Sequence, residues 1–302
     1  MLKKIIVNRD YHNSRFDRWF KHNVLNIPQS LLEKFIRKNK IKLKNKKIKT
    51  SYRVQYQDII EIYGIEKIKV KKLKKNQIYK PSVQEKKRYD KFIIENNDDF
   101  IVINKPSGIP VQSGTQSFKN IIDILKDTHY FNFTKPYIVH RLDKETSGVM
   151  IIAKNREYAQ LFTSLFRIRK IHKTYLAIVH GKVNQNIKVL KDDLVTYENK
   201  KKIIQKAISY LKILNTNDKY SLLELKPVTG RKHQLRKQLF NIGNPIVGDD
   251  KYNNDYEKKK YTNKYLMLHA HKIKFMINNN KYNFLANYDI NFDNFVKKNF
   301  KT

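Results

Sequence analysis

Residues 140–154 read HRLDKETSGVMIIAK, and this stretch joins a polar turn to a buried strand. The turn holds Asp143 among other charged residues, and the run from Val149 to Ala153 that follows is apolar throughout. A short apolar run bounded by a polar turn is typical of a strand buried in a sheet. A carboxylate beside such a strand is well placed for chemistry, because rigid elements fix its position. We therefore expect Asp143 to be either a structural ion-pair partner or a catalytic group.

The chain is strongly basic. Its 302 residues carry 64 Lys and Arg against 27 Asp and Glu, a formal net charge of +37. This excess favours a polyanionic partner, with RNA or DNA as the leading candidate and an anionic membrane or general solubility as alternatives. The absence of cysteine excludes disulfides, thiolate zinc ligands and cysteine nucleophiles. No apolar run is long enough to cross a bilayer, and the N-terminus lacks the apolar core of a signal peptide, so we expect a cytoplasmic protein.

The first part of the chain predicts a compact unit of two helices and short strands. Ser-x-x-acid patterns at Ser14 and Ser30 resemble capping boxes at the starts of the two helices. Alternating apolar residues between positions 40 and 63 predict half-buried strands. The cation-rich segment 67–91 predicts a linker, which either lies along phosphates or is solvated without a partner.

From Phe92 onward the sequence predicts a mixture of strands and helices, and therefore an α+β class. Asn155 is a candidate cap for the most strongly amphipathic helix, and Gly243 is expected to end a basic helix. The expected elements are two strands joined by a turn in 92–105, helices in 118–126, 155–169 and 230–243, strands in 173–183 and 266–277, a hairpin in 208–228, and a mobile surface insertion in 253–264.

Asp143 has two readings on its local sequence. An aspartate in a turn is more often a cap or an ion-pair partner than a catalytic group. However, Arg141 and Lys144 flank it, and a second basic cluster, residues 231–236, is predicted on a helix. An arginine beside Asp143 would keep the carboxylate ionised, and an ionised carboxylate can act as a nucleophile or a base.

Several stretches of the chain, in family order across residues 92–277, resemble the RluA-type pseudouridine synthases. The N-terminal unit, through IPQSLLEKFIRKNKIKLKNKKIKTSYRVQYQDIIEI (27–62), resembles an S4 RNA-binding domain. The stretches that carry the resemblance to the synthases are HRLDKETSGVMIIAK itself, NKPSGIPVQSG (104–114), KTYLAIVHG (173–181), LELKPVTGRKHQLR (223–236), NPIVGDDKY (244–252) and LMLHAHKIKF (266–275).

The resemblance implies an S4 domain over residues 1–75, a basic linker over 76–90 and a catalytic domain over 91–302. The catalytic domain is expected to have a mixed, largely antiparallel sheet with flanking helices. The implied reaction is the isomerisation of uridine to pseudouridine in 23S ribosomal RNA, with no cofactor and no metal. We expect the protein to act as a monomer.

The same resemblance assigns roles within the site. Asp143 is the essential carboxylate, Tyr175 packs against the target base, and Arg236 pairs with the carboxylate, which we expect to be a bidentate contact. Asp143 would attack the base C6 or the ribose C1′, or remove the 2′ proton, and the sequence does not choose between these routes. The expected RNA-binding residues are Arg141, which enters the RNA as the nucleotide flips out, and His140, Leu142, Lys105, Arg231 and His233, the two histidines also being expected as hydrogen-bonded structural groups.

Some positions depart from the family pattern. Gln112 stands where a histidine is usual, Lys232 where a threonine is usual, and Lys237-Gln238 where an apolar residue and a histidine are usual. These departures bear on RNA contacts and on the choice of uridine, not on the reaction.

Two other functions stay open on the sequence. The protein could be a non-catalytic RNA-binding assembly factor that kept the fold, or a sister synthase that acts on other rRNA or tRNA uridines. The presence of Asp143, Tyr175 and Arg236 together favours an enzyme. A metal site at His269 and His271 is not expected, because no cysteine or glutamate accompanies them at ligand spacing.

Overall fold

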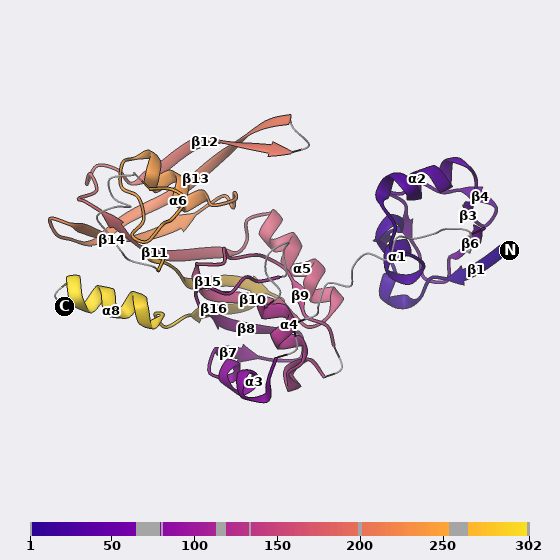
Figure 1. Cartoon of the computed structure of the whole chain (residues 1–302), viewed down its shortest axis with the longest axis horizontal. Coiled ribbons are helices and arrows are strands. Elements are labelled where there is room, and N and C mark those ends of the chain that lie inside the picture. The colour runs from indigo at the N-terminus through magenta and orange to yellow at the C-terminus, as the bar shows by residue number, and fades with distance from the viewer. Residues whose placement is uncertain are drawn as a thin grey trace. The chain divides into compact units, whose positions relative to one another are not determined.

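The computed structural model describes residues 2–64, 79, 81–112, 119–132, 134–198, 201–253 and 265–300. The chain folds into two compact units, residues 1–76 and 77–302 (Figure 1). Most of the insertion expected in 253–264, and the first half of the expected linker, lie outside the described residues. None of the helices in the described ranges is long and apolar enough to cross a membrane.

The first unit packs two helices against a four-stranded sheet of order β1-β6-β3-β4. Phe16, Trp19 and Phe20 of one helix and Leu32 and Ile36 of the other are buried in its core. Both expected helices are confirmed, whereas the first strand was not expected. The elements are β1 (Leu2–Ile6), a 3-10 turn (Arg9–Tyr11), β2 (Ser14–Arg15), α1 (Phe16–Asn23), α2 (Gln29–Arg37), β3 (Ile41–Leu43), β4 (Lys46–Lys47), β5 (Arg53–Val54) and β6 (Ile59–Tyr63).

Both expected capping boxes are wrong. Ser14 lies in β2, paired with Val54, and its hydroxyl donates to the carbonyl of Tyr11 at 2.6 Å instead of capping α1. Pro28 precedes α2, so Ser30 lies inside the helix. Pro28 is the N-cap of this helix and cannot supply a side-chain cap, and its carbonyl accepts the N–H groups of Leu31 and Leu32 at 3.0 and 3.1 Å.

The second unit is built on a ten-stranded sheet of order β12-β13-β14-β11-β15-β10-β8-β7, with β16 on β15 and β9 on β10. The β10–β15 pair is parallel and the other described pairs are antiparallel, which confirms the expected mixed, largely antiparallel sheet. The strands are β7 (Ile93–Asn96), β8 (Phe100–Lys105), β9 (Tyr137–Ile138), β10 (Ser147–Ala153), β11 (His172–His180), β12 (Val189–Glu198), β13 (Lys201–Thr216), β14 (Tyr220–Pro227), β15 (Leu268–Ile277) and β16 (Asn280–Leu285).

The helices of this unit agree with most of the expectations. Asn155 caps the predicted long helix, accepting a hydrogen bond from the Tyr158 N–H at 2.9 Å. Gly243 follows the basic helix with a φ of +80°, as expected for a glycine that ends a helix. The helices are α3 (Val83–Asp90), α4 (Ile121–Lys126), a 3-10 turn (His129–Phe131), α5 (Arg156–Arg167), α6 (Gln234–Asn241) and α8 (Ile290–Asn299).

The end of the expected linker is helical. Residues 83–90 form α3, which Ser82 caps by accepting a hydrogen bond from the Glu85 N–H. Tyr89 of this helix is buried in the core of the second unit. The prediction of a linker is therefore wrong for these residues, because burial of Tyr89 fixes this cationic segment to the second unit. The sequence patterns also did not predict β12, β16 and α8.

The most deeply buried strand of the second unit is β10, and every one of its residues is buried. It pairs with β8 along six residues and with β15 at Ser147 and Gly148. Phe100 and Phe162 pack edge to face beside it. Because β10 is fixed on both sides, the turn that precedes it (residues 140–146) has a rigid support.

Gly148 is expected to tolerate no side chain. Its φ is +112°, and an added Cβ would overlap the carbonyl oxygen of Ala270 on β15. We expect Gly148→Ala to lower the free energy of unfolding by more than about 3 kcal/mol, measured by urea unfolding. Gly108 is the control, since its φ is +82° but an added Cβ would meet nothing within 4 Å, so Gly108→Ala should cost about 1–2 kcal/mol. Equal losses in the two variants would contradict the crowding at β15.

Candidate active site

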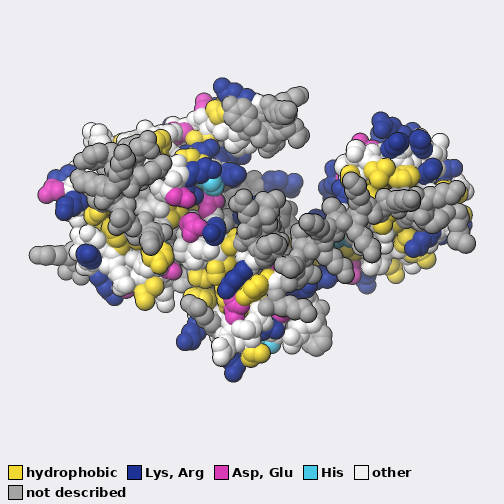
Figure 2. Space-filling model, in the orientation of Figure 1, with side chains coloured by type: hydrophobic (Ala, Val, Ile, Leu, Met, Phe, Trp, Pro, Cys, Tyr) yellow, Lys and Arg dark blue, Asp and Glu magenta, His cyan; other side chains and the backbone are white. Residues whose placement is uncertain are grey.

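A cleft of about 1060 Å³ opens in the second unit. Its walls are the turn 140–146, the start of β11 and the segment from Pro227 to Arg236. Dark blue Lys and Arg side chains surround a hollow of this unit in the space-filling view, with acidic and histidine side chains visible inside it (Figure 2). The volume is in the range of small-molecule sites, so the cleft can take a single nucleotide.

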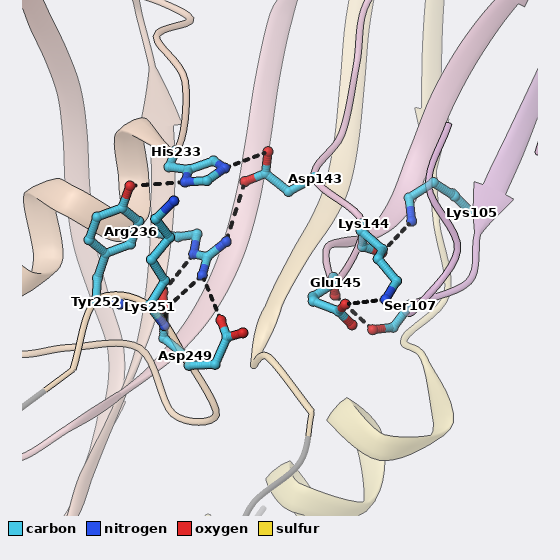
Figure 3. Close-up of polar contacts among 11 residues, drawn as sticks. Lys105, Ser107, Asp143, Lys144, Glu145, His233, Arg236, Asp249, Lys251 and Tyr252 are labelled. Atoms are coloured by element: carbon cyan, nitrogen blue, oxygen red, sulfur yellow. Dashed lines mark hydrogen bonds and ion pairs between the residues drawn. The ribbon is translucent and has the colours of Figure 1, made fainter. Parts of the chain in front are cut away.

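The turn that carries Asp143 is held by the loop after β8 (Figure 3). The Lys105 ammonium and the Gly108 N–H both donate to the carbonyl of Lys144, each at 3.0 Å. The Ser107 hydroxyl donates to the carbonyl of Glu145 at 2.7 Å. These contacts bind the turn to β8 as well as to β10, which restricts the backbone at Asp143.

Asp143 faces two basic side chains from α6 and the residue before it. Arg236 Nη1 lies 3.9 Å from Asp143 Oδ2, and His233 Nε2 lies 3.7 Å from Asp143 Oδ1 (Figure 3). The Asp143 side chain is 32 % exposed, so its oxygens are open to a ligand in the cleft. The structure therefore brings together the expected carboxylate and the expected arginine from distant parts of the chain.

The expected bidentate pair of Arg236 with Asp143 is wrong. Arg236 instead forms its bidentate pair with Asp249, with Nε to Oδ2 and Nη2 to Oδ1 both at 2.6 Å. The Asp249 side chain is fully buried and also accepts the N–H groups of Lys251 and Tyr252. Burial alone would lower the pKa of Arg236, but the hydrogen bonds and charge of Asp249 outweigh it and raise that pKa. Arg236 is thus a fixed cation that Asp143 approaches with one oxygen.

Tyr175 lies on β11 and lines the same cleft. Its ring packs at the junction of the two hydrophobic clusters of this unit. Burial, and secondly the charge of Asp143, raise the pKa of the Tyr175 hydroxyl, so the phenol is protonated at neutral pH. No group in the described part of the chain hydrogen-bonds this hydroxyl, which leaves the O–H available to a ligand.

Two of the expected RNA-binding residues have structural roles instead. Lys105 is fully buried, and its ammonium donates to the carbonyls of Pro106, Ile109 and Lys144. His140 accepts the Ile151 N–H through Nε2 at 2.9 Å, and burial lowers its pKa to about 3. The prediction that Lys105 contacts RNA is therefore wrong, because its donors are all used inside the protein. His140 is the hydrogen-bonded structural group that the sequence also predicted.

The other expected RNA-binding residues all line the cleft, as His140 does. Arg141 is exposed, whereas Leu142 is buried in the core. Arg231 donates through Nε to the carbonyl of Lys206 at 3.2 Å. His233 Nδ1 lies 3.0 Å from the Tyr252 hydroxyl, and burial lowers the pKa of His233, so it is neutral at neutral pH.

The residues that depart from the family pattern also include both cleft-lining residues and a buried structural residue. Gln112 and Lys232 are exposed and line the cleft, as residues that contact RNA would. Gln238 is fully buried, accepts from Ser209 at 2.7 Å and donates to Asp192 at 3.0 Å. The expectation that Gln238 affects RNA contacts is therefore wrong. Its side chain instead holds α6 against β12 and β13.

Asp249, Tyr252 and Lys173 belong to the site but were not predicted. Tyr252 lies under Arg236, whose guanidinium carbon is 5.2 Å from the ring centroid. Lys173 lines the cleft on the same strand as Tyr175. The sequence marks GDDKY (248–252) only as part of the family resemblance, because nothing local shows which of its acidic residues turns inward. Within the described ranges no group of three His, Asp or Glu side chains could hold a metal ion.

Comparison with known proteins identifies the family to which the chain belongs. The RNA pseudouridylate synthase family model matches residues 99–241. A ribosomal large subunit pseudouridine synthase C from Rickettsia felis is 34 % identical over 86 % of this chain and 88 % of its own length. The chain belongs to the pseudouridine synthase family.

Other relatives cover larger or smaller shares of the chain. A ribosomal large subunit pseudouridine synthase C from Buchnera aphidicola subsp. Acyrthosiphon pisum is 30 % identical over 97 % of this chain and 96 % of its own. Among solved structures, human RNA pseudouridylate synthase domain containing 4 superposes with a TM-score of 0.60 at 26 % identity, covering 70 % of this chain and 94 % of the human one. The synthase fold of the second unit is thus shared with a solved member.

Removing Asp249 should unfold the site. Asp249→Ala leaves Arg236 buried without its bidentate partner, and we expect a loss of about 3–5 kcal/mol in the free energy of unfolding. Asp250 also contacts Arg236 but its side chain is 85 % exposed, so Asp250→Ala should cost under about 1 kcal/mol. Urea unfolding of both variants at neutral pH makes the comparison, and similar losses would show that the bidentate pair is not the anchor.

His140 should make the protein sensitive to acid. Its folded pKa of about 3 lies below the ordinary 6.5, so its contribution is complete above pH 6.5 and falls as the pH drops. Between pH 7.5 and 5 this group should remove about 2 kcal/mol of unfolding free energy. His140→Gln, measured by urea unfolding at both pH values, should lose that part of the slope. His172→Gln, at an exposed position, should keep the wild-type slope, and a slope unchanged in His140→Gln would refute the assignment.

Proposed function

We propose that this protein isomerises specific uridines of 23S ribosomal RNA to pseudouridine, with Asp143 as the catalytic carboxylate. The observation that carries the proposal is a partly exposed carboxylate at 3.9 Å from a buried, anchored arginine, in a cleft that Tyr175 also lines. The relatives named ribosomal large subunit pseudouridine synthase C support the choice of RNA.

The chemistry requires a uridine outside the RNA stack. Extruding a nucleotide costs a few kcal/mol, and stacking on an aromatic side chain such as Tyr175 recovers about 1–3 kcal/mol. The bond from C1′ to N1 breaks, the uracil rotates, and a bond from C1′ to C5 forms. The C5 proton leaves and N1 gains a proton, so atoms and charge balance without a cofactor.

Asp143 would act at the start of this sequence. Its carboxylate attacks the base C6 or the ribose C1′, or removes the 2′ proton as the glycosidic bond breaks. In each route the oxygens must point into the cleft. Arg236 is anchored, and the Lys105 ammonium and the Gly108 N–H both donate to the carbonyl of Lys144. These contacts restrict where the oxygens can point.

RNA capture would use both units. We assign the first unit as an S4 RNA-binding domain, on the resemblance of residues 27–62 and on its helices packed against a small sheet. A hollow of about 450 Å³ in this unit is lined by Lys44, Lys46, Lys47 and Lys49, with Leu43 and Tyr52. Contacts between these lysines and RNA phosphates would make the affinity for RNA fall steeply as the salt concentration rises. The protein would work as a monomer in the cytoplasm, where ribosomal RNA is modified.

A non-catalytic assembly factor is the less favoured function. Such a protein would need the basic surface but not a carboxylate exposed in the cleft and opposed by a dedicated arginine. A sister synthase with other rRNA or tRNA targets differs only in the uridine that enters the cleft, and the target must therefore be mapped.

Asp143→Asn should abolish the modification. In a strain deleted for this gene, we expect one or more pseudouridines of 23S rRNA to disappear in carbodiimide-based mapping and to return with the wild-type gene. Asp143→Asn should not restore them, with a rate loss of at least about a thousand-fold in vitro. Asp193→Asn, at an exposed position of β12, is the matched control and should restore them fully.

The outcomes separate the candidate functions. Modification that persists with Asp143→Asn would leave only the non-catalytic function. Loss of pseudouridines from tRNA instead of 23S rRNA would identify a sister synthase.

A further inference from the structure

One cation of the cleft has no evident role in holding the protein together. Lys173 lies on β11 two residues before Tyr175. The register of β11 against β15 shifts between Thr174 and Tyr175, and both Lys173 and Tyr175 line the cleft whereas Thr174 does not. The Lys173 ammonium also lies beside the backbone of Gly230, 3.7 Å from where a Cβ at that residue would be.

Among the described residues, Lys173 has no anionic partner. Burial lowers the pKa of its ammonium, yet no carboxylate of the described residues lies within ion-pairing distance and no carbonyl accepts its protons. The other buried cations of this region are satisfied, Lys105 by three carbonyls and Arg236 by Asp249. A cation partly withdrawn from water without a counter-charge destabilises the folded protein, so stability does not explain its presence.

The missing partner is best supplied by the substrate. The one group that every RNA nucleotide offers with a full negative charge is the phosphodiester. Residues two apart on a strand are separated by about 6.6 Å, so a base that stacks on Tyr175 would have its own backbone within reach of Lys173. A partly desolvated ammonium binds such an anion more strongly than the exposed cations at the rim of the cleft do.

We propose that Lys173 is a positioning residue that binds a non-bridging oxygen of a phosphodiester next to the flipped uridine. It would hold the backbone of the extruded nucleotide while Tyr175 holds the base. This inference rests on the proposed function for the identity of the RNA, but not for the ammonium–phosphate contact itself.

The test is a double perturbation of protein and RNA. The RNA is a synthetic 23S rRNA stem–loop that contains the mapped uridine, with either ordinary phosphates or a single neutral methylphosphonate on the 5′ or the 3′ side of that uridine. Lys173→Met removes the charge at similar length, and Lys173→Arg keeps it. Lys170→Met removes the same charge from an exposed residue nearby that does not line the cleft, and it controls for the change in net charge.

We expect Lys173→Met to lower kcat/KM on ordinary RNA about 10- to 100-fold, as for the loss of a hydrogen bond to a charged group. One methylphosphonate should cost the wild type a similar factor and should cost Lys173→Met nothing more. Lys173→Arg should retain that sensitivity, and Lys170→Met should behave as the wild type. Thermal unfolding should show that Lys173→Met is at least as stable as the wild type, because it removes an unpaired charge.

The same cycle measured on the Kd of the stem–loop separates the two proposals. If the wild type forms pseudouridine but the effects of Lys173→Met and of each methylphosphonate simply add, the Lys173 inference is overturned. If the Kd values show the coupling but the wild type forms no pseudouridine, the phosphate contact stands and the proposed function fails. Additive Kd values without turnover would refute both.

Discussion

The site depends on a buried bidentate pair between Arg236 and Asp249. Asp249 has no exposed side-chain surface and its oxygens accept from both the guanidinium and the following backbone. This pair fixes a positive charge at the wall of the cleft, from which Nη1 reaches Asp143 at 3.9 Å. An arginine held in this way need not be ordered by Asp143, so the carboxylate keeps its freedom to react while its neighbour stays in place.

The buried cations of the second unit differ in their hydrogen-bond and ion-pair partners. Lys105 spends its three donors on carbonyls and thereby fixes the turn that carries Asp143. Arg236 is neutralised by carboxylates, whereas Lys173 finds no anion among the described residues. Because an unpaired charge away from water is costly, this difference separates structural cations from one available to a ligand. Net charge alone, at +37, could not make that distinction.

The scaffold behind the site is rigid for reasons of packing. β10 is buried along its whole length between β8 and β15, and Gly148 allows the parallel strand to approach. The turn 140–146 therefore begins and ends on fixed supports. Its opposite wall, α6, is held by Gln238 against β12 and β13. Lys105 is an expected RNA contact, and Gln238 departs from the family pattern. In the structure both residues instead position the two walls of the cleft.

Sequence analysis predicts the class of fold, most of the strands and helices of the second unit, the family, and the meeting of Asp143, Tyr175 and Arg236 in one cleft. These predictions follow from local periodicity, from caps such as Asn155, and from family motifs that can be recognised in the sequence alone. The three-dimensional structure shows in addition that Arg236 is bidentate to Asp249, that Lys105 and Gln238 serve the fold, and that Lys173 has no anionic partner among the described residues. Those facts depend on which groups lie within a few ångströms across the sheet, and that proximity leaves no periodic trace along the chain.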